Sequence, residues 1–333
     1  MGKLNLTFKS QRLDFQGFNG PFVTHGIDVI DDPERPDGEA VYIFAVNHVP
    51  NSHHFNLHDK QAPKSRSVIE VFHHVIGSKV AQHIRTVWHE LITTPNDVVA
   101  LSPTSLLVTN DHYYTEGHMR AVEDLYYGAK WSNTVHVTFS GAGKSTHDAD
   151  GVQASVALDS LHNNNGIGRG NRPDQIVIVT AASGTVNFGN LVTSDGRVQI
   201  HINSTFEAES ALDNPSYFAD PYANSTFDAS GYTQCGLARA GDLLKNIRDP
   251  DGKDGVMVWH VSETSQGRHR SAEDEQGTWG ARLLFEDDSS RIRTGSAAVL
   301  VAIDPAKENG SRKAWLYMTG FLSKNMVAAK IDL

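Results

Sequence analysis

Apolar residues along this chain come in short runs, and turn-forming residues separate one run from the next. Runs of this length that are rich in Val, Ile, Thr and aromatic residues are typical of β-strands. Two segments contain two runs joined by a tight turn and predict hairpins, residues 96–111 and 174–191. The other predicted strand segments are residues 40–48, 133–141, 255–262, 297–304 and 313–332. The pattern therefore predicts an all-β fold.

Two segments instead place apolar residues three and four apart, which is the spacing of an amphipathic helix. They are residues 117–130 and 234–248. Residues 262–278 are polar and charged, so we expect a solvated loop there. Antiparallel units that return after roughly 40 to 50 residues favour a β-propeller. A sandwich and a pair of β domains are the alternatives.

Composition and charge exclude some classes of function. The chain has 333 residues, 39% of them hydrophobic, which is enough for a large core in one or two domains. Its formal charge of −10 and pI near 5.9 argue against a nucleic-acid partner. No run of about 18 apolar residues occurs, so we expect no transmembrane helix, and the first residues lack the apolar core of a signal peptide. The sequence does not indicate an oligomeric state.

The compartment is indicated by sequons rather than by cysteines. The single cysteine, Cys235, excludes an internal disulfide but does not decide between compartments. Four N-x-[ST] sequons predict glycosylation and passage through the secretory pathway, with a cytoplasmic location as the alternative. The sequon residues are Asn5, Asn203, Asn224 and Asn309.

Amides and carboxylates stand at the ends of several apolar runs. They lie at residues 96–97, 110–112, 163–165 and 213–214. Oxygen ligands that arrive from separate loops suit Ca²⁺, which takes six to eight of them in loose geometry. Each pair taken alone can equally cap a strand or form a turn through side-chain hydrogen bonds.

Two histidines also stand where strand-like runs begin or end. His25 lies in "THGID" and His48 follows "IFAVN". Imidazole suits acid–base chemistry because its ordinary pKa lies near neutrality. With 17 histidines in the chain, a structural role is the alternative for any one of them.

Several longer motifs carry a resemblance to a known family. They are "THGID", "VNHVPNS", "VIEVFHH", "TVWHELITTPNDVVAL", "LLVTNDHYY", "HNNNGIG" and "LDNPSYFADPYA". In order and spacing they resemble the serum paraoxonase and arylesterase family, especially its fungal members. The resemblance implies that residues 1–333 form a single six-bladed β-propeller, with a structural calcium deep in the tunnel and a catalytic calcium at its mouth. It also implies hydrolysis of lactones and aryl esters.

The resemblance assigns roles to individual residues. His25 and His48 match the family's pair of active-site histidines, which is thought to activate water. The ligands of the catalytic calcium match Asn96, Asn165, Asp213 and Asn214. The structural calcium matches Asp97 and the backbone carbonyl of Ile27. Asn47, Asn96, Asn165 and Asn214 are the amides expected to contact the substrate.

One departure from the family affects the metal. The family has an adjacent Glu-Asp pair in the first blade that supplies one carboxylate to each calcium. Before His25 this chain offers Asp14 in "RLDF", a context that does not match. Because calcium affinity rises with ligand charge, we expect both sites to be weak or empty. An altered or incomplete first blade is also expected.

The missing pair leaves three functions open. The first is a metal-independent hetero-Diels–Alderase like those of fungal tropolone-sesquiterpenoid biosynthesis, which some paraoxonase-like proteins resemble. It would join an o-quinone methide, formed by dehydration, to a polyene such as a humulene-type sesquiterpene, and it would need a shaped apolar cavity rather than a cofactor. The second is a calcium-dependent lactonase or arylesterase that uses His25 and His48. The third is a non-catalytic propeller that binds a ligand. Both enzymes would take small hydrophobic substrates.

Overall fold

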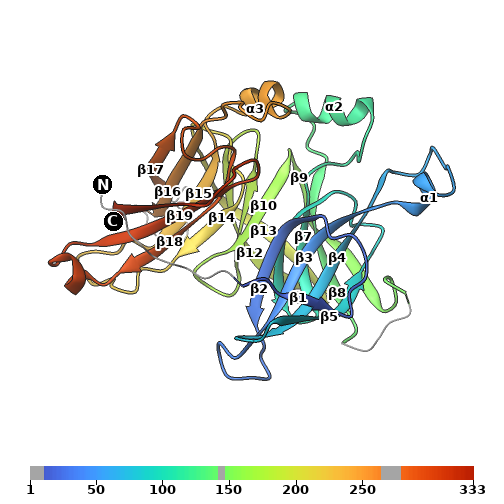
Figure 1. Cartoon of the computed structure of the whole chain (residues 1–333), viewed down its shortest axis with the longest axis horizontal. Helices are drawn as coiled ribbons and strands as arrows, with labels where there is room; N and C mark the ends of the chain where they lie inside the picture. Colours follow the sequence, from blue (N-terminus) through green and yellow to red (C-terminus); the bar gives the residue numbers. More distant parts are fainter. Residues whose placement is uncertain (1–10, 142–146, 264–278) are drawn as a thin grey trace.

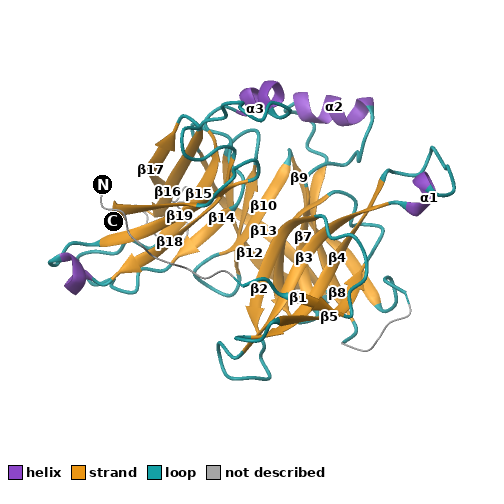
Figure 2. Cartoon of the chain, in the orientation of Figure 1, coloured by secondary structure: helices purple, strands orange, loops and turns teal. Residues whose placement is uncertain are grey.

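The structure is a computed structural model that describes residues 11–141, 147–263 and 279–333, and it is an all-β propeller with few helices (Figures 1 and 2). The first sheet has the strand order β1-β5-β4-β3-β2. Its strands are β1 (Asp14–Gln16), β2 (Thr24–Asp31), β3 (Ala40–Pro50), β4 (Ser65–Val75) and β5 (Val80–Val87). The second sheet contains β6 (Pro95–Ser102), β7 (Ser105–Asn110), β8 (Ser132–Phe139) and β9 (Val152–Leu161).

The remaining sheets follow in chain order. The third contains β10 (Asn164–Arg169), β11 (Gln175–Thr180), β12 (Thr185–Ser194) and β13 (Arg197–Glu207). The fourth contains β14 (Pro215–Phe218), β15 (Gly231–Leu237), β16 (Val256–Glu263) and β17 (Trp279–Asp287). The fifth contains β18 (Gly295–Ile303), β19 (Lys313–Gly320) and β20 (Val327–Asp332). Short helices occur at α1 (Ser52–Phe55), α2 (His118–Leu125), α3 (Ala240–Asn246) and the 3-10 turn η2 (Pro305–Glu308).

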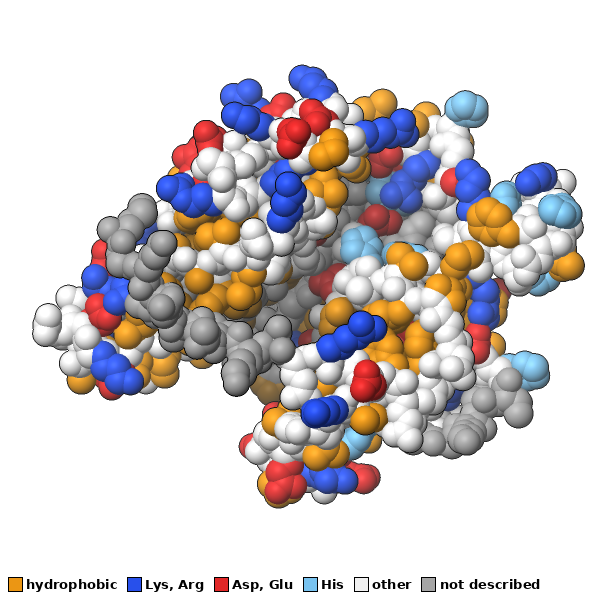
Figure 3. All heavy atoms as spheres, viewed as in Figure 1, with side chains coloured by type: hydrophobic (Ala, Val, Ile, Leu, Met, Phe, Trp, Pro, Cys, Tyr) orange, Lys and Arg blue, Asp and Glu red, His pale blue; other side chains and the backbone are white. Residues whose placement is uncertain are grey.

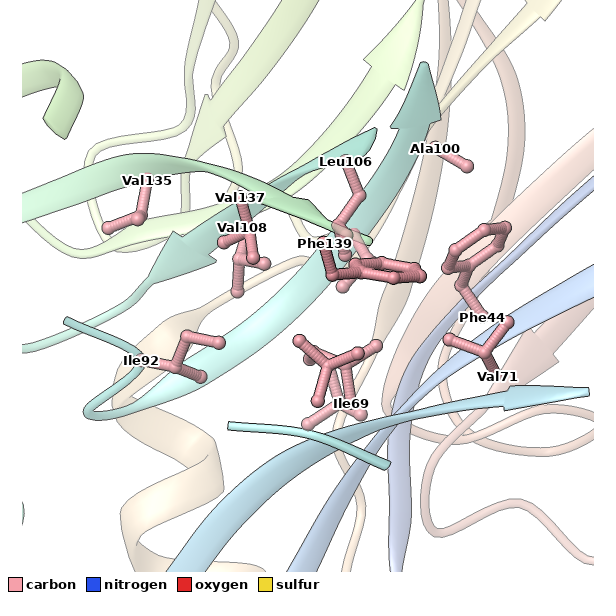
Figure 4. Close-up of a cluster of buried hydrophobic side chains, with 13 residues drawn as sticks. Phe44, Ile69, Val71, Ile92, Ala100, Leu106, Val108, Val135, Val137 and Phe139 are labelled. Atoms are coloured by element: carbon pink, nitrogen blue, oxygen red, sulfur yellow. The ribbon is translucent and has the colours of Figure 1, made fainter. Parts of the chain in front are cut away.

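Each hydrophobic cluster lies between two neighbouring sheets. The cluster between the first and second sheets includes Phe44 and Ile69 on one side and Leu106, Val137 and Phe139 on the other (Figure 4). Three further clusters join the second sheet to the third, the third to the fourth and the fourth to the fifth. Burial of one such side chain stabilises the fold by roughly 1.5–3 kcal/mol. The sheets are therefore held together in chain order.

The described residues form five sheets, and the prediction of six blades is not confirmed. The segment before β2 does not begin another sheet. Its strand β1 pairs in parallel with β5, with Asp14 opposite Val80, and so widens the first sheet to five strands. The fifth sheet has three strands.

The predicted elements were found where hydrophobic alternation was strong. Both predicted hairpins are present, as β6–β7 and β11–β12. The helix expected at 117–130 is the shorter α2. The helix expected at 234–248 is wrong in its first part, because β15 runs to Leu237 and is buried along its whole length between β14 and β16. Most of the loop expected at 262–278 lies outside the described residues.

The innermost strands position the site. They are β2, β6, β10, β14 and β18, and each contacts the next in that order. Helices α2 and α3 both lie along the top edge of the molecule in the view of Figure 1. In the described part of the chain, no helix combines the length and apolar character that crossing a bilayer requires.

Candidate active site at the inner strands

Most of the predicted site residues line one cavity. It has a volume of about 1490 Å³ and lies where the inner strands converge. The predicted residues in its lining are His25, Ile27, Asn96, Asp97, Asn165, Asp213 and Asn214. In Figure 3, acidic and histidine side chains show within the hollow between the two halves of this face. Segments far apart in sequence thus supply one site.

Two glycines allow the inner strands to approach closely. A Cβ on Gly26 would lie 2.4 Å from both Cα and Oδ1 of Asp97. A Cβ on Gly166 would lie 2.3 Å from the carbonyl oxygen of Asp213 and 2.8 Å from Asn214 Oδ1. Both positions therefore require glycine, as is usual where another backbone lies against a strand. The two contacts bring the polar pairs of β6 and the turn before β14 against β2 and β10.

The cavity contains two buried carboxyl groups of unusual acidity. Burial raises the pKa of Asp97 to about 7, and the negative charge of Asp213 adds to this, although the backbone N–H groups of Ile167 and Val98 oppose it. Burial also raises the pKa of Asp213 to about 6. Negative charge is therefore disfavoured here unless a cation accompanies it.

Amide oxygens stand beside these carboxylates. Asn165 Oδ1 is buried and has no hydrogen-bond partner. Asn214 donates from Nδ2 to Ser296 Oγ (3.1 Å), so its Oδ1 is not engaged in that contact. Buried acceptors without donors are rare in folded proteins and fit an oxygen-binding cation.

The oxygen donors at the cavity are of the type that calcium binds, but they carry little negative charge. The described residues contain no group of three or more His, Cys, Asp or Glu side chains that could hold a metal. Four carboxylates line the cavity, but Asp28 pairs with Arg169 and Asp124 with His112, which leaves Asp97, Asp213 and several amides as donors. Since calcium affinity depends on ligand charge, such a set suits a weakly held ion.

The two predicted histidines are in contact. His25 Nδ1 lies 3.3 Å from His48 Nε2, and His48 Nδ1 lies 2.8 Å from Ser67 Oγ. His25 lines the cavity, whereas His48 lies behind it, so the two form a relay into the first sheet.

Both imidazoles are biased toward the neutral form. Burial lowers the pKa of His25, and the charge of Asp111 partly opposes this shift. Burial lowers the pKa of His48 as well, with a further contribution from His25. The His25 side chain is exposed on the concave wall, yet enough protein surrounds it to weaken hydration of its charged form.

Asn47 differs from its predicted role. It is fully buried and does not line the cavity. Its Oδ1 accepts from Val23 N–H (2.8 Å), and its Nδ2 donates to Pro21 O (3.1 Å) and Glu70 Oε1 (3.0 Å). With its hydrogen-bonding groups engaged by protein, Asn47 supports the backbone rather than contacting a substrate.

A cluster of acidic and basic side chains lies near the histidines, and the sequence marked its residues 110–112 only as one of several polar strand ends. His112 lies 2.9 Å from Asp111 Oδ1 and 2.5 Å from Asp124 Oδ1 of α2. Burial favours a high pKa for Asp111, but the close contact with His112 and the charge of Arg120 bring it below its ordinary value. The charge of Asp111 thus acts to raise the pKa of both histidines. The motif "TNDHYY" was its only signal in sequence.

The rim of the cavity is apolar. Leu125 at the end of α2 is 80% exposed and Leu244 of α3 is 76% exposed, and both also line the cavity. Exposed leucines at the entrance of a cavity with a polar floor favour small hydrophobic ligands that carry a polar group.

The sequon residues in the described part of the chain do not line this cavity. Asn203, Asn224 and Asn309 are exposed. Asn5 lies outside the described residues.

Comparisons with known proteins match part of the chain. Residues 22–156 match the model of the arylesterase family. Serum paraoxonase/arylesterase 1 of Mus musculus is 34% identical over 124 residues, which are 37% of this chain and 28% of that protein. Serum paraoxonase/arylesterase 2 of Gallus gallus is 34% identical over 122 residues, 36% of this chain and 29% of that protein. The alignments thus span less than a third of each relative.

Among solved structures, a putative 6-phosphogluconolactonase from Bacteroides fragilis NCTC 9343 aligns over 92% of this chain and 83% of its own, with 9% identity and a TM-score of 0.39. That score is too low to support any inference. Of the predicted active-site residues, Asn165, Asp213 and Asn214 lie beyond the segment that matches the family model, and the others lie within it.

Proposed function

Since this chain is paraoxonase-like over residues 22–156, we propose that it hydrolyses lactones or aryl esters in the cavity at the inner strands. The observation that carries the proposal is the contact of His25, in the cavity wall, with His48 behind it. The apolar rim supports small hydrophobic substrates.

The histidine relay explains how a water molecule would be activated. When His48 Nδ1–H donates to Ser67 Oγ and His25 Nδ1–H donates to His48 Nε2, the lone pair of His25 Nε2 remains available. Water gives a proton to this nitrogen as its oxygen attacks the carbonyl carbon. The imidazolium then protonates the leaving alkoxide or phenoxide oxygen as the C–O bond breaks.

Calcium is part of the proposal. We assign the catalytic ion to Asn96, Asn165, Asp213 and Asn214, and a structural ion to Asp97 with the carbonyl of Ile27. The raised pKa values of Asp97 and Asp213 support this, because they mark buried charge that a cation would compensate. When bound, calcium supplies polarisation of the substrate carbonyl and charge for the developing oxyanion.

A substitution with a matched control tests the hydrolase. His25→Gln should reduce kcat/KM for phenyl acetate or a γ-lactone by roughly 10²–10⁴-fold, the usual contribution of a general base. His136→Gln is the control, because His136 also contacts a serine, Ser105, at 2.9 Å and also has a pKa lowered by burial, yet it does not line the cavity. Wild-type rates in His25→Gln would overturn the proposal.

A second candidate is the hetero-Diels–Alderase, favoured by the volume of the cavity. About 1490 Å³ with an apolar rim has room for two hydrophobic reactants, and typical ligand pockets measure roughly 300–1,000 Å³. Positioning of an o-quinone methide and a polyene needs no metal.

A further inference from the structure

The backbone that leads into His25 is held by the neighbouring strand β3. Residues 21–23 lie outside any strand. Val23 N–H donates to Asn47 Oδ1, Asn47 Nδ2 donates to Pro21 O, and His48 N–H donates to Val23 O at 3.0 Å. Two adjacent residues of β3 therefore fix this segment at three points.

His25 itself lies in an irregular part of the ladder. Thr24 is opposite Asn47 and Ile27 is opposite Ala45, so β2 has one extra residue between these pairs. Such a bulge leaves residues unpaired and redirects a side chain. The regular ladder thus does not determine where His25 points. The hydrogen bonds to residues 21–23 fix the backbone on the N-terminal side of His25.

Glu70 sets the orientation of the side-chain amide with which Asn47 makes these hydrogen bonds. It is 3% exposed, and its carboxylate accepts from Asn47 Nδ2 (3.0 Å) and Thr86 Oγ1 (2.7 Å) and lies 2.9 Å from His83 Nε2. A carboxylate can only accept, so Asn47 must direct its NH₂ group to Glu70 and its oxygen to Val23 N–H. A neutral amide at position 70 would permit the reverse orientation.

Strand register and aromatic packing keep Glu70 in place. Glu70 is opposite both Ala45 and Thr86 in its sheet, which brings Asn47 to a diagonal position on the same face. Phe72 and Phe18 contact the ring of His83, at centroid distances of 5.2 and 5.3 Å. Hydrogen bonds in such surroundings are stronger than in water.

We propose that Glu70 and Asn47 are positioning residues that fix the backbone before His25 and thereby hold its ring against His48. Neither touches the substrate. The inference rests on the proposed hydrolase for its kinetic consequence, whereas the contact between the rings can be measured without turnover.

The test uses Glu70→Gln and Asn47→Ala in the full chain, with Asn187→Ala as the matched control. Asn187 is a buried asparagine whose Nδ2 donates to Ile178 O, and it does not line the cavity. Glu70 and Asn47 together are called the clamp. In both clamp variants, kcat for phenyl acetate should fall roughly 10²-fold, as expected when a catalytic group is misplaced by about 1 Å. KM should stay near the wild-type value because the cavity wall is unchanged. Asn187→Ala should keep wild-type kcat.

Two further measurements separate the clamp from the proposed reaction. The nuclear Overhauser effect between ring protons of His25 and His48 should weaken in the clamp variants, and the amides of Val23 and His48 should exchange faster. If the wild type does not hydrolyse esters but these changes occur, the clamp stands and the hydrolase fails. If Glu70→Gln, which is nearly isosteric, keeps the ring contact and the slow exchange, the clamp is wrong.

Discussion

The carboxylate of Asp97 in the second sheet accepts a hydrogen bond from the backbone N–H of Ile167 in the third, at 3.0 Å. The bond joins two sheets at their inner strands and fixes a buried charge in the cavity. Val98 N–H donates to the other oxygen at 2.9 Å. Two backbone donors do not offset the loss of hydration, because the pKa of Asp97 still rises to about 7.

The first prediction concerns stability against pH without calcium. The pKa of Asp97 is about 7 in the folded chain against 3.8 as the ordinary value, so the folded state keeps a proton that the unfolded state has lost. The free energy of unfolding should therefore fall as pH rises from about 4 to about 7. Urea unfolding in chelator at several pH values measures it. Since other groups also titrate, the wild-type slope is compared with that of Asp97→Asn, which should be flatter.

The second prediction concerns calcium itself. Because the site supplies few carboxylates, the purified protein should hold no stoichiometric calcium, and chelator should barely change its melting temperature. Added calcium at about ten times its Kd should stabilise the fold by about 1.4 kcal/mol, and by less at pH 5, where protons compete for the carboxylates. Elemental analysis and thermal unfolding check both points. One or two tightly bound ions per chain would contradict it.

The third prediction uses the charge of Asp111. The acidic limb of the kcat/KM profile should lie below pH 6.5, because burial lowers the pKa of both His25 and His48 and the base must be neutral. Asp111 opposes those shifts, so Asp111→Asn should move the limb to still lower pH. Asp148→Asn is the control, since Asp148 pairs with Arg66 and is not among the charges that shift the pKa of either histidine. A limb that moves to higher pH in Asp111→Asn would refute this.

The sequence predicted the architecture where local patterns were strong. The strands of the hairpins β6–β7 and β11–β12 show clear alternation of apolar and polar residues or are buried on both faces. The sequence predicted both hairpins. Around Cys235 the same spacing of apolar residues suited a helix, and burial between two strands made it β15 instead. The number of sheets depends on where β1 pairs, which local sequence does not encode.

The site was predicted in its residues more than in its geometry. Motifs placed His25 and His48 together, but the bulge at His25 and the burial of Asn47 follow from strand register. Ser67 and Glu70 reach the site because β4 lies beside β3, with His48 opposite Ser67. Pairings across about 20 residues leave no local signal in a single sequence.

The fourth prediction concerns glycosylation. We propose that the protein passes through the secretory pathway, and its exposed sequons would then carry sugar at Asn203 or Asn224. Asn224 Oδ1 accepts from Thr226 N–H and hydroxyl, so that sequon forms a local turn at the surface. Intact mass after expression through a eukaryotic secretory route, before and after glycosidase, measures it. An unchanged mass would favour a cytoplasmic protein.

The last prediction separates hydrolysis from cycloaddition through His48. In a hydrolase, His48→Gln breaks the relay from Ser67 to His25 and should remove most turnover, by roughly 10²–10⁴-fold. In a cycloaddition the bond-forming step moves no proton, and positioning does most of the work. The same substitution should then slow formation of the o-quinone methide by dehydration but leave capture of a preformed one unchanged.

The deciding measurement compares three proteins, the wild type, His48→Gln and the control His136→Gln. Each is incubated with a preformed o-quinone methide and a polyene, and separately with simple γ- and δ-lactones. Rate and stereochemical excess over buffer are recorded for the first reaction and hydrolysis for the second. If the wild type hydrolyses lactones and gives neither acceleration nor stereocontrol in the cycloaddition, the cycloaddition hypothesis is wrong. The opposite outcome is that the wild type and His48→Gln control the cycloaddition equally well and neither hydrolyses lactones. The catalytic element is then the cavity rather than the histidine relay, and the hydrolase proposal is wrong.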